Sequence, residues 1–119
     1  MENRITAFIR KKISLYNNVR LPKSMYRDIL YDVKVYLIRF ILSEFNEYKN
    51  EFVFEKDKLI QFPRTKKFGD EYKPFYETFI KILNEQKQES YEIQKYGSHD
   101  FIITAVQDIL YEIYACFIY

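Results

Sequence analysis

The segment MYRDILYDVKVYLIRFILSEFNEY, residues 25–48, decides the fold class. Its polar stripe recurs at spacings of four, seven, four and four residues, which is the spacing of one side of an α-helix. Nearly every other position is large and apolar. A helix with so narrow a polar stripe is contacted on most of its sides. We therefore expect residues 25–48 to form either the central helix or a helix covered by a second subunit. The stripe consists of Asp28, Asp32, Arg39, Ser43 and Glu47.

A shorter helix is predicted before this segment, over Arg4–Tyr16. Its apolar residues are spaced by three, one, four and three positions, again one helical face. Pro22 pushes the preceding residue out of the helical region, which ends this helix. Ser24 then provides the start signal of the long helix.

Residues 51–62 change character. Two apolar runs, Phe52–Phe54 and Leu59–Phe62, flank the polar turn Glu55–Lys58, a pattern typical of a short β-hairpin. A loop or a helical extension are the alternatives. Pro63–Asp70 is predicted to be irregular.

Two further helices complete the predicted fold. The third begins near Lys73, because Pro74 suits the first turn of a helix. The fourth spans about His99–Phe117, and we expect its apolar end to be packed. The sequence thus predicts a mainly α protein: a single domain over residues 1–119, built as a compact bundle of about four helices with a short β-hairpin near 51–62.

Composition restricts the chemistry that the chain can perform. Of 119 residues, 48% are hydrophobic and 19% aromatic, which is ample for a core. The single Cys116 excludes an internal disulfide and a Cys-only zinc site. The N-terminus lacks the architecture of a signal peptide, and no apolar run approaches the ~20 residues of a membrane span. We therefore expect a cytoplasmic protein that makes no contact with a membrane.

No residue pattern predicts an active site. The pairs Asp28/Asp32 and Asp108/Glu112 have a spacing that could place a divalent metal between two helices, which is the basis of a third reading as a metal-dependent enzyme. Both pairs lie in polar stripes, so we expect them to face solvent. His99 has no positioned partner, and Cys116 is predicted to be buried and inert among apolar neighbours. Two glycines cannot form a phosphate-binding loop. We expect no catalytic residue, metal or cofactor.

Charge is unevenly distributed although the net charge is only +2. Residues 1–27 carry seven Lys/Arg against one acid, whereas residues 84–119 carry two Lys against six acids. The basic residues either are solvated and attract the acidic end weakly, or they form a surface that binds nucleic acid, with Tyr16 and Tyr26 stacking on bases. They are Arg4, Arg10, Lys11, Lys12, Arg20, Lys23 and Arg27.

Aromatic residues crowd the C-terminal end. Tyr111, Tyr114, Phe117 and Tyr119 form a candidate interface, since Tyr buries area while keeping a polar group. We expect a non-enzymatic, small intracellular protein-binding domain of the inhibitor, immunity or accessory-subunit type, with another protein or a second copy (a homodimer) as the partner. The alternative is an RNA- or DNA-binding accessory protein that uses the basic N-terminal third.

Overall fold

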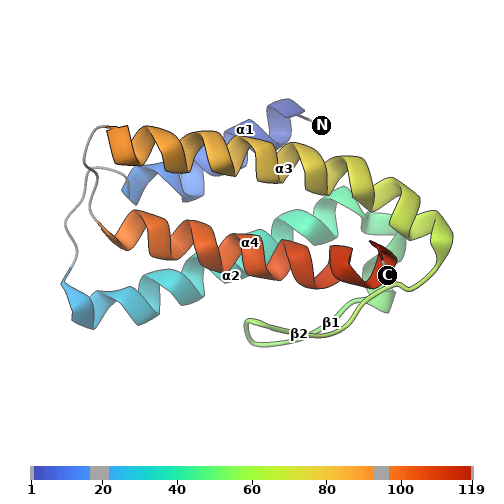
Figure 1. The fold of residues 1–119 in the computed structure, drawn as a ribbon. Coiled ribbons are helices and arrows are strands. Elements are labelled where there is room, and N and C mark those ends of the chain that lie inside the picture. The colour runs from blue at the N-terminus through green and yellow to red at the C-terminus, as the bar shows by residue number, and fades with distance from the viewer. Residues whose placement is uncertain (1, 17–21, 93–96, 119) are drawn as a thin grey trace.

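The computed structural model describes residues 2–16, 22–92 and 97–118, and over these ranges it is a helical bundle with one β-hairpin (Figure 1). The predicted mainly α fold with a short hairpin is confirmed. The described helices are α1 (Glu2–Lys12), α2 (Lys23–Glu44), α3 (Lys66–Glu92) and α4 (Gly97–Ile118), with two 3₁₀ turns, η1 (Ser14–Tyr16) and η2 (Asn46–Glu51). The strands are β1 (Val53–Glu55) and β2 (Lys58–Gln61).

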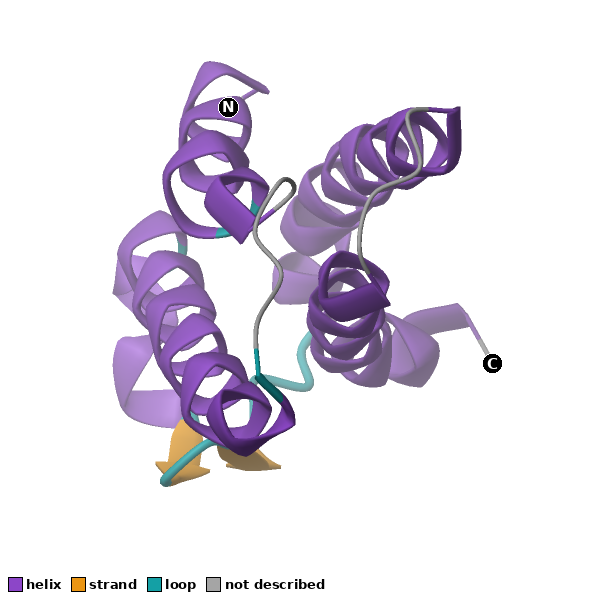
Figure 2. Cartoon of the chain, turned by 90° about the vertical axis from the view of Figure 1, so that its left-hand side faces the viewer, coloured by secondary structure: helices purple, strands orange, loops and turns teal. Residues whose placement is uncertain are grey.

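The four α-helices occupy the corners of a roughly square bundle when it is viewed end-on (Figure 2). α3 packs along α4, α1 packs on α3, and α2 packs on α4. α2 and α4 both begin at the left of Figure 1 and run side by side in the same direction. The hairpin lies beneath α2 and α4 in that view.

The core is built largely from aromatic rings. Phe68, Tyr72, Phe75 and Phe79 follow one another at spacings of four, three and four along α3, and all four are fully buried. Phe45 meets three of these rings, with centroids 5.1–5.8 Å away, so the end of α2 is fixed by ring contacts. Such pairs add stability beyond the area that they bury.

α2 lies at a corner of the bundle, so the prediction of a central helix is wrong. Its buried residues are Val33, Leu37, Ile38 and Ile41, all in the second half of the helix or close to it. In its N-terminal half, Met25 and Tyr31 are exposed. The spacing of polar and apolar residues in the sequence could not distinguish a helix that is covered on most sides from one that leaves apolar side chains exposed to solvent. Cover by a second subunit stays a prediction.

α3 begins at Lys66 rather than near Lys73, which also shortens the predicted irregular stretch. Thr65 caps the helix, because its Oγ1 accepts a hydrogen bond from the Phe68 backbone N–H at 3.3 Å. Pro74 therefore lies inside the helix. Its missing N–H leaves the Asp70 carbonyl without a helical donor, and both residues are on the exposed side, where water can replace that donor. α3 bends in this region (Figure 1).

Two predicted helix starts are also shifted. Pro22 occupies the N-cap of α2 with extended backbone and no side-chain cap, so Ser24 lies within the helix. The fourth helix is predicted from about His99, whereas α4 begins at Gly97. Residues 93–96, between α3 and α4, lie outside the described residues.

The hairpin has a two-residue loop, tighter than the predicted four-residue turn. Lys56 adopts a positive φ of 60° there, a conformation that two-residue hairpin loops require. Phe54 pairs with Leu59, while Val53 pairs with Gln61, so Ile60 is an extra residue in a β-bulge. Ile60 is 57% exposed.

Candidate functional site

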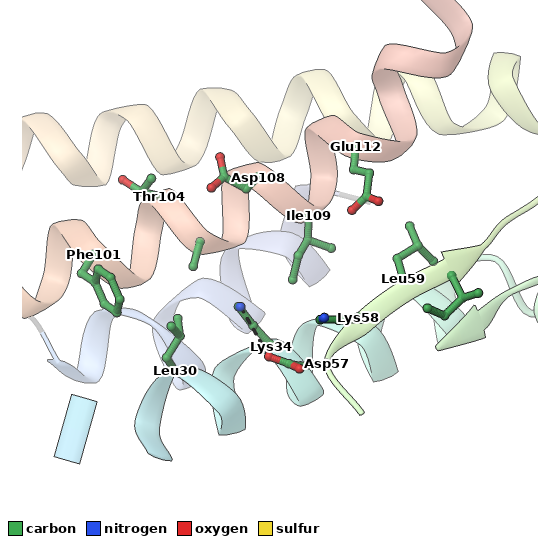
Figure 3. A pocket seen from close by; sticks show the side chains of 12 residues that line it. Leu30, Lys34, Asp57, Lys58, Leu59, Phe101, Thr104, Asp108, Ile109 and Glu112 are labelled. Carbon is green, nitrogen blue, oxygen red and sulfur yellow. Dashed lines mark hydrogen bonds and ion pairs between the residues drawn. The ribbon is translucent and has the colours of Figure 1, made fainter. Parts of the chain in front are cut away.

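A groove of about 510 Å³ runs between α2, the hairpin and α4, and it is the candidate site (Figure 3). α4 forms one wall, and α2 and the hairpin form the other. The apolar residues of this α2–hairpin–α4 groove are Leu30, Leu59, Ile60, Phe101, Ala105 and Ile109.

Large apolar side chains of the groove face solvent. Phe101 is 48% exposed although its ring lies 6.3 Å from that of Tyr26 on α2. Ile60 is exposed on the opposite end of the groove. Ala105, between them on α4, is small and leaves the middle of the groove open. An open apolar surface with polar margins is typical of a binding site for another macromolecule.

The groove margin carries both signs of charge. Lys34 Nζ and Asp57 Oδ2 form an ion pair at 3.4 Å, which ties the hairpin loop to α2. Asp108 and Glu112 line the α4 wall and have no hydrogen-bonding or ionic partner for their carboxylates among the described residues. Figure 3 shows Glu112 directed from α4 toward the hairpin. The wall therefore offers negative charge that the groove itself does not neutralise, apart from Lys58 nearby.

The structure divides the predicted basic surface into groups with different surroundings. Arg4 forms an ion pair with Glu44 at 3.0 Å, and Lys12 lies 3.8 Å above the Tyr36 ring. Arg10 and Lys11 are exposed on the last turn of α1.

The other members of the basic set belong to α2 or fall outside the description. Lys23 and Arg27 are exposed on the first turns of α2. Arg20 lies outside the described residues. Among the described residues of the set, Arg10, Lys11, Lys23 and Arg27 are therefore the ones available to an anionic partner.

The predicted aromatic interface is drawn largely into the bundle. Tyr114 stacks on Tyr76 of α3 with ring centroids 4.1 Å apart. Phe117 is half-buried and contacts the Phe68 ring at 5.9 Å. Tyr111 is exposed, and Tyr119 lies outside the described residues. Most of this aromatic excess therefore serves internal packing.

Cys116 is exposed, so the prediction of a buried cysteine is wrong. It lies four residues after Glu112 and eight after Asp108, which continues their exposed helical face. Its thiol Sγ lies 3.7 Å from the Glu112 carbonyl oxygen. The apolar neighbours in sequence point to other sides of the helix.

The acidic pairs are also exposed. Asp28 and Asp32 lie on α2 away from the groove, whereas Asp108 and Glu112 line it, so the structure does not bring the two pairs together in this groove. Within the described ranges, no group of three or more His, Cys, Asp or Glu side chains is placed to hold a metal ion.

α4 is also notable for its hydropathy. The sequence-based statement that no apolar run approaches the length of a membrane span is wrong for this helix: by length and composition, Phe101–Ile118 is apolar enough to cross a membrane, with a mean hydropathy of 1.6, and a third of it is buried in the bundle. Core helices of soluble proteins pass the same criterion. The sequence pattern of α4 alone could have signalled its open side, because its apolar residues extend beyond the width of one packed face.

The groove was missed at the sequence level because its residues come from three separate elements. The chain has no significant match to a family model, to a curated protein or to a solved structure.

Proposed function

We propose that this protein is a small, non-enzymatic protein-binding domain that acts in the cytoplasm by docking a partner protein in the α2–hairpin–α4 groove. The observation that carries the proposal is the groove itself, with an open apolar floor and charged margins. Inhibitors, immunity factors and accessory subunits are proteins of this class, since they act by covering a surface rather than by making bonds.

Two features support association over catalysis. Of the titratable side chains of the groove, Lys34 and Asp57 are paired with each other, Lys58 lies on the hairpin, and Asp108 and Glu112 are spread along an exposed helical wall. General acid–base chemistry needs a positioned donor and acceptor around a shared reaction centre. An apolar floor with a polar margin is the anatomy of a protein interface.

The test fills the groove with one side chain. Ala105→Arg places a long charged side chain in the middle of the floor, where Ala105 is half-buried. Affinity capture from the source cell, using wild type and this variant as baits, should recover a partner with wild type and lose it with Ala105→Arg.

Ala7→Arg is the matched control. Ala7 is exposed on α1, far from the groove in sequence and on a different helix, so this variant should retain the partner. Far-UV circular dichroism checks that both variants are folded. Capture that survives Ala105→Arg unchanged, or that Ala7→Arg abolishes equally, would contradict the proposal.

A further inference from the structure

We propose that the occupant of the groove is a second copy of this chain, bound in the antiparallel sense about a two-fold axis perpendicular to the groove. This inference rests on the proposed function, because it names the partner for the same surface. It follows from the distribution of charge along the groove and from the direction of its two helices.

One side of α2 continues the groove beyond its lining residues. Lys23, Arg27, Leu30 and Lys34 are spaced by four, three and four residues, which places them in one row along the helix. Leu30 and Lys34 line the groove, so Lys23 and Arg27 extend the same row toward the start of α2. Both are exposed. Among the side chains that the structure describes, this end of the groove is therefore basic.

The opposite end is acidic. The Tyr26 ring contacts the Phe101 ring, so these two residues lie at the same height along the neighbouring helices α2 and α4. From Phe101 to Glu112 is eleven residues, or about 16 Å of helix at 1.5 Å per residue. Because α2 and α4 run in the same direction (Figure 1), Arg27 lies near one end of the groove and Glu112 near the other. Asp108 and Glu112 together outweigh Lys58 at that end.

A two-fold axis through the middle of the groove exchanges the two ends. The basic end of each copy then faces the acidic end of the other, so the same attractive contact forms twice. The apolar centre, with the small Ala105, meets its own counterpart, and Phe101 at one end lies toward Ile60 at the opposite end of the other copy. An isologous contact of this kind closes on itself and stops at two subunits. It also covers the exposed apolar residues that the monomer leaves open.

The experiment reverses one charge at each end. Alone, Arg27→Glu places an acid opposite Glu112 of the other copy, twice per dimer, and Glu112→Lys places a base opposite Arg27 twice. Each variant should therefore be a monomer at a concentration where wild type elutes, in size-exclusion chromatography with light scattering, at twice the 14.7 kDa chain mass. The expected loss of dimer affinity is at least about tenfold for each variant.

An equimolar mixture of the two variants should restore the dimer. In the mixed pair, the substituted position 27 of one copy is acidic and faces the substituted position 112 of the other, which is basic. The unchanged Arg27 and Glu112 face each other at the second contact, so both contacts are attractive. The matched controls are Arg39→Glu, on the opposite side of α2, and Glu77→Lys, on the exposed side of α3, and both should stay dimeric.

Each contrary result has a definite meaning. A monomeric wild type at high concentration overturns the inference, and so does a dimer that survives both charge reversals. A mixture that stays monomeric overturns the antiparallel arrangement and with it the inference. If another protein is captured in an Ala105-dependent manner while wild type is monomeric, the proposed function stands without the dimer. If neither binds, both fail.

Discussion

Replacing Gly69 with alanine tests how tightly α3 and α4 are packed. A Cβ at this position would lie 2.6 Å from Cδ1 and 3.0 Å from Cε1 and Cγ of Phe117, well inside van der Waals contact. The Phe117 ring must therefore shift away from Phe62 and Phe68, whose centroids are 6.4 and 5.9 Å from its own. Overpacking of this kind costs about 2 kcal/mol.

Two opposing contributions decide whether Gly69→Ala stabilises or destabilises the fold. Alanine is a better helix former than glycine by about 1 kcal/mol in a helix interior. The overpacking cost exceeds this gain, so we expect Gly69→Ala to lower the free energy of unfolding by about 1 kcal/mol. For a chain of this length, that corresponds to a fall in Tm of about 4 °C.

The background variant Phe117→Ala reverses the prediction. With the ring removed, the new Cβ meets open space, and Gly69→Ala should raise the free energy of unfolding by about 1 kcal/mol. The coupling between the two sites is then about 2 kcal/mol, measured as a double-mutant cycle from urea denaturation followed by circular dichroism. A stabilising Gly69→Ala in wild type, or a coupling below about 0.5 kcal/mol, would refute the packing that places Phe117 over Gly69.

Three further predictions concern α3 and its contacts. Tyr72→Phe removes the hydrogen bond that the buried Tyr72 hydroxyl donates to the Leu110 carbonyl. It should lower the free energy of unfolding, measured by urea denaturation, by only about 1 kcal/mol, because that carbonyl keeps its helical donor. An unchanged urea midpoint would exclude the bond. Thr65→Ala removes the cap on the Phe68 N–H and should lower the free energy of unfolding by about 1 kcal/mol in the same urea experiment. Thr65→Ser keeps a hydroxyl at the cap and should retain most of the wild-type stability. Burial raises the pKa of Tyr72 well above its usual value, so its neutral form is favoured in the folded state: its contribution to stability is complete below about pH 10, the usual pKa of an unfolded tyrosine, and is lost as the pH rises above that value. The free energy of unfolding should fall less steeply above about pH 10 in Tyr72→Phe than in wild type, and parallel curves would rule out this contribution.

Element type could be read from the sequence because the signals were local. The periodicity of residues 25–48 is a property of that segment alone, and so is the alternation of apolar runs around residues 55–58. The start of α3 could not be read in the same way. Pro74 carries a strong local signal for a helix beginning, but Thr65 and the burial of Phe68 and Tyr72 determine where the helix begins.

The groove could not be predicted from the sequence, because its residues come from segments that are far apart along the chain. Leu30, Ile60 and Ala105 become neighbours only because α2 and α4 run side by side and the hairpin folds against both. For the same reason, the exposure of Cys116 was missed, since residues adjacent in sequence are poor guides to the side of a helix that faces solvent.

The hairpin has a practical consequence for observing the groove at work. Its two strands pair with each other and with no further strand in the described part of the chain, and a two-stranded ribbon is only marginally stable by itself. The Lys34–Asp57 pair and the packing of Phe54 and Leu59 hold it in place. Its backbone amides should therefore exchange with deuterium faster than those of α3, and slow down when the groove is covered. The exchange rate of these amides therefore reports whether the groove is occupied, without any chemical modification of the protein.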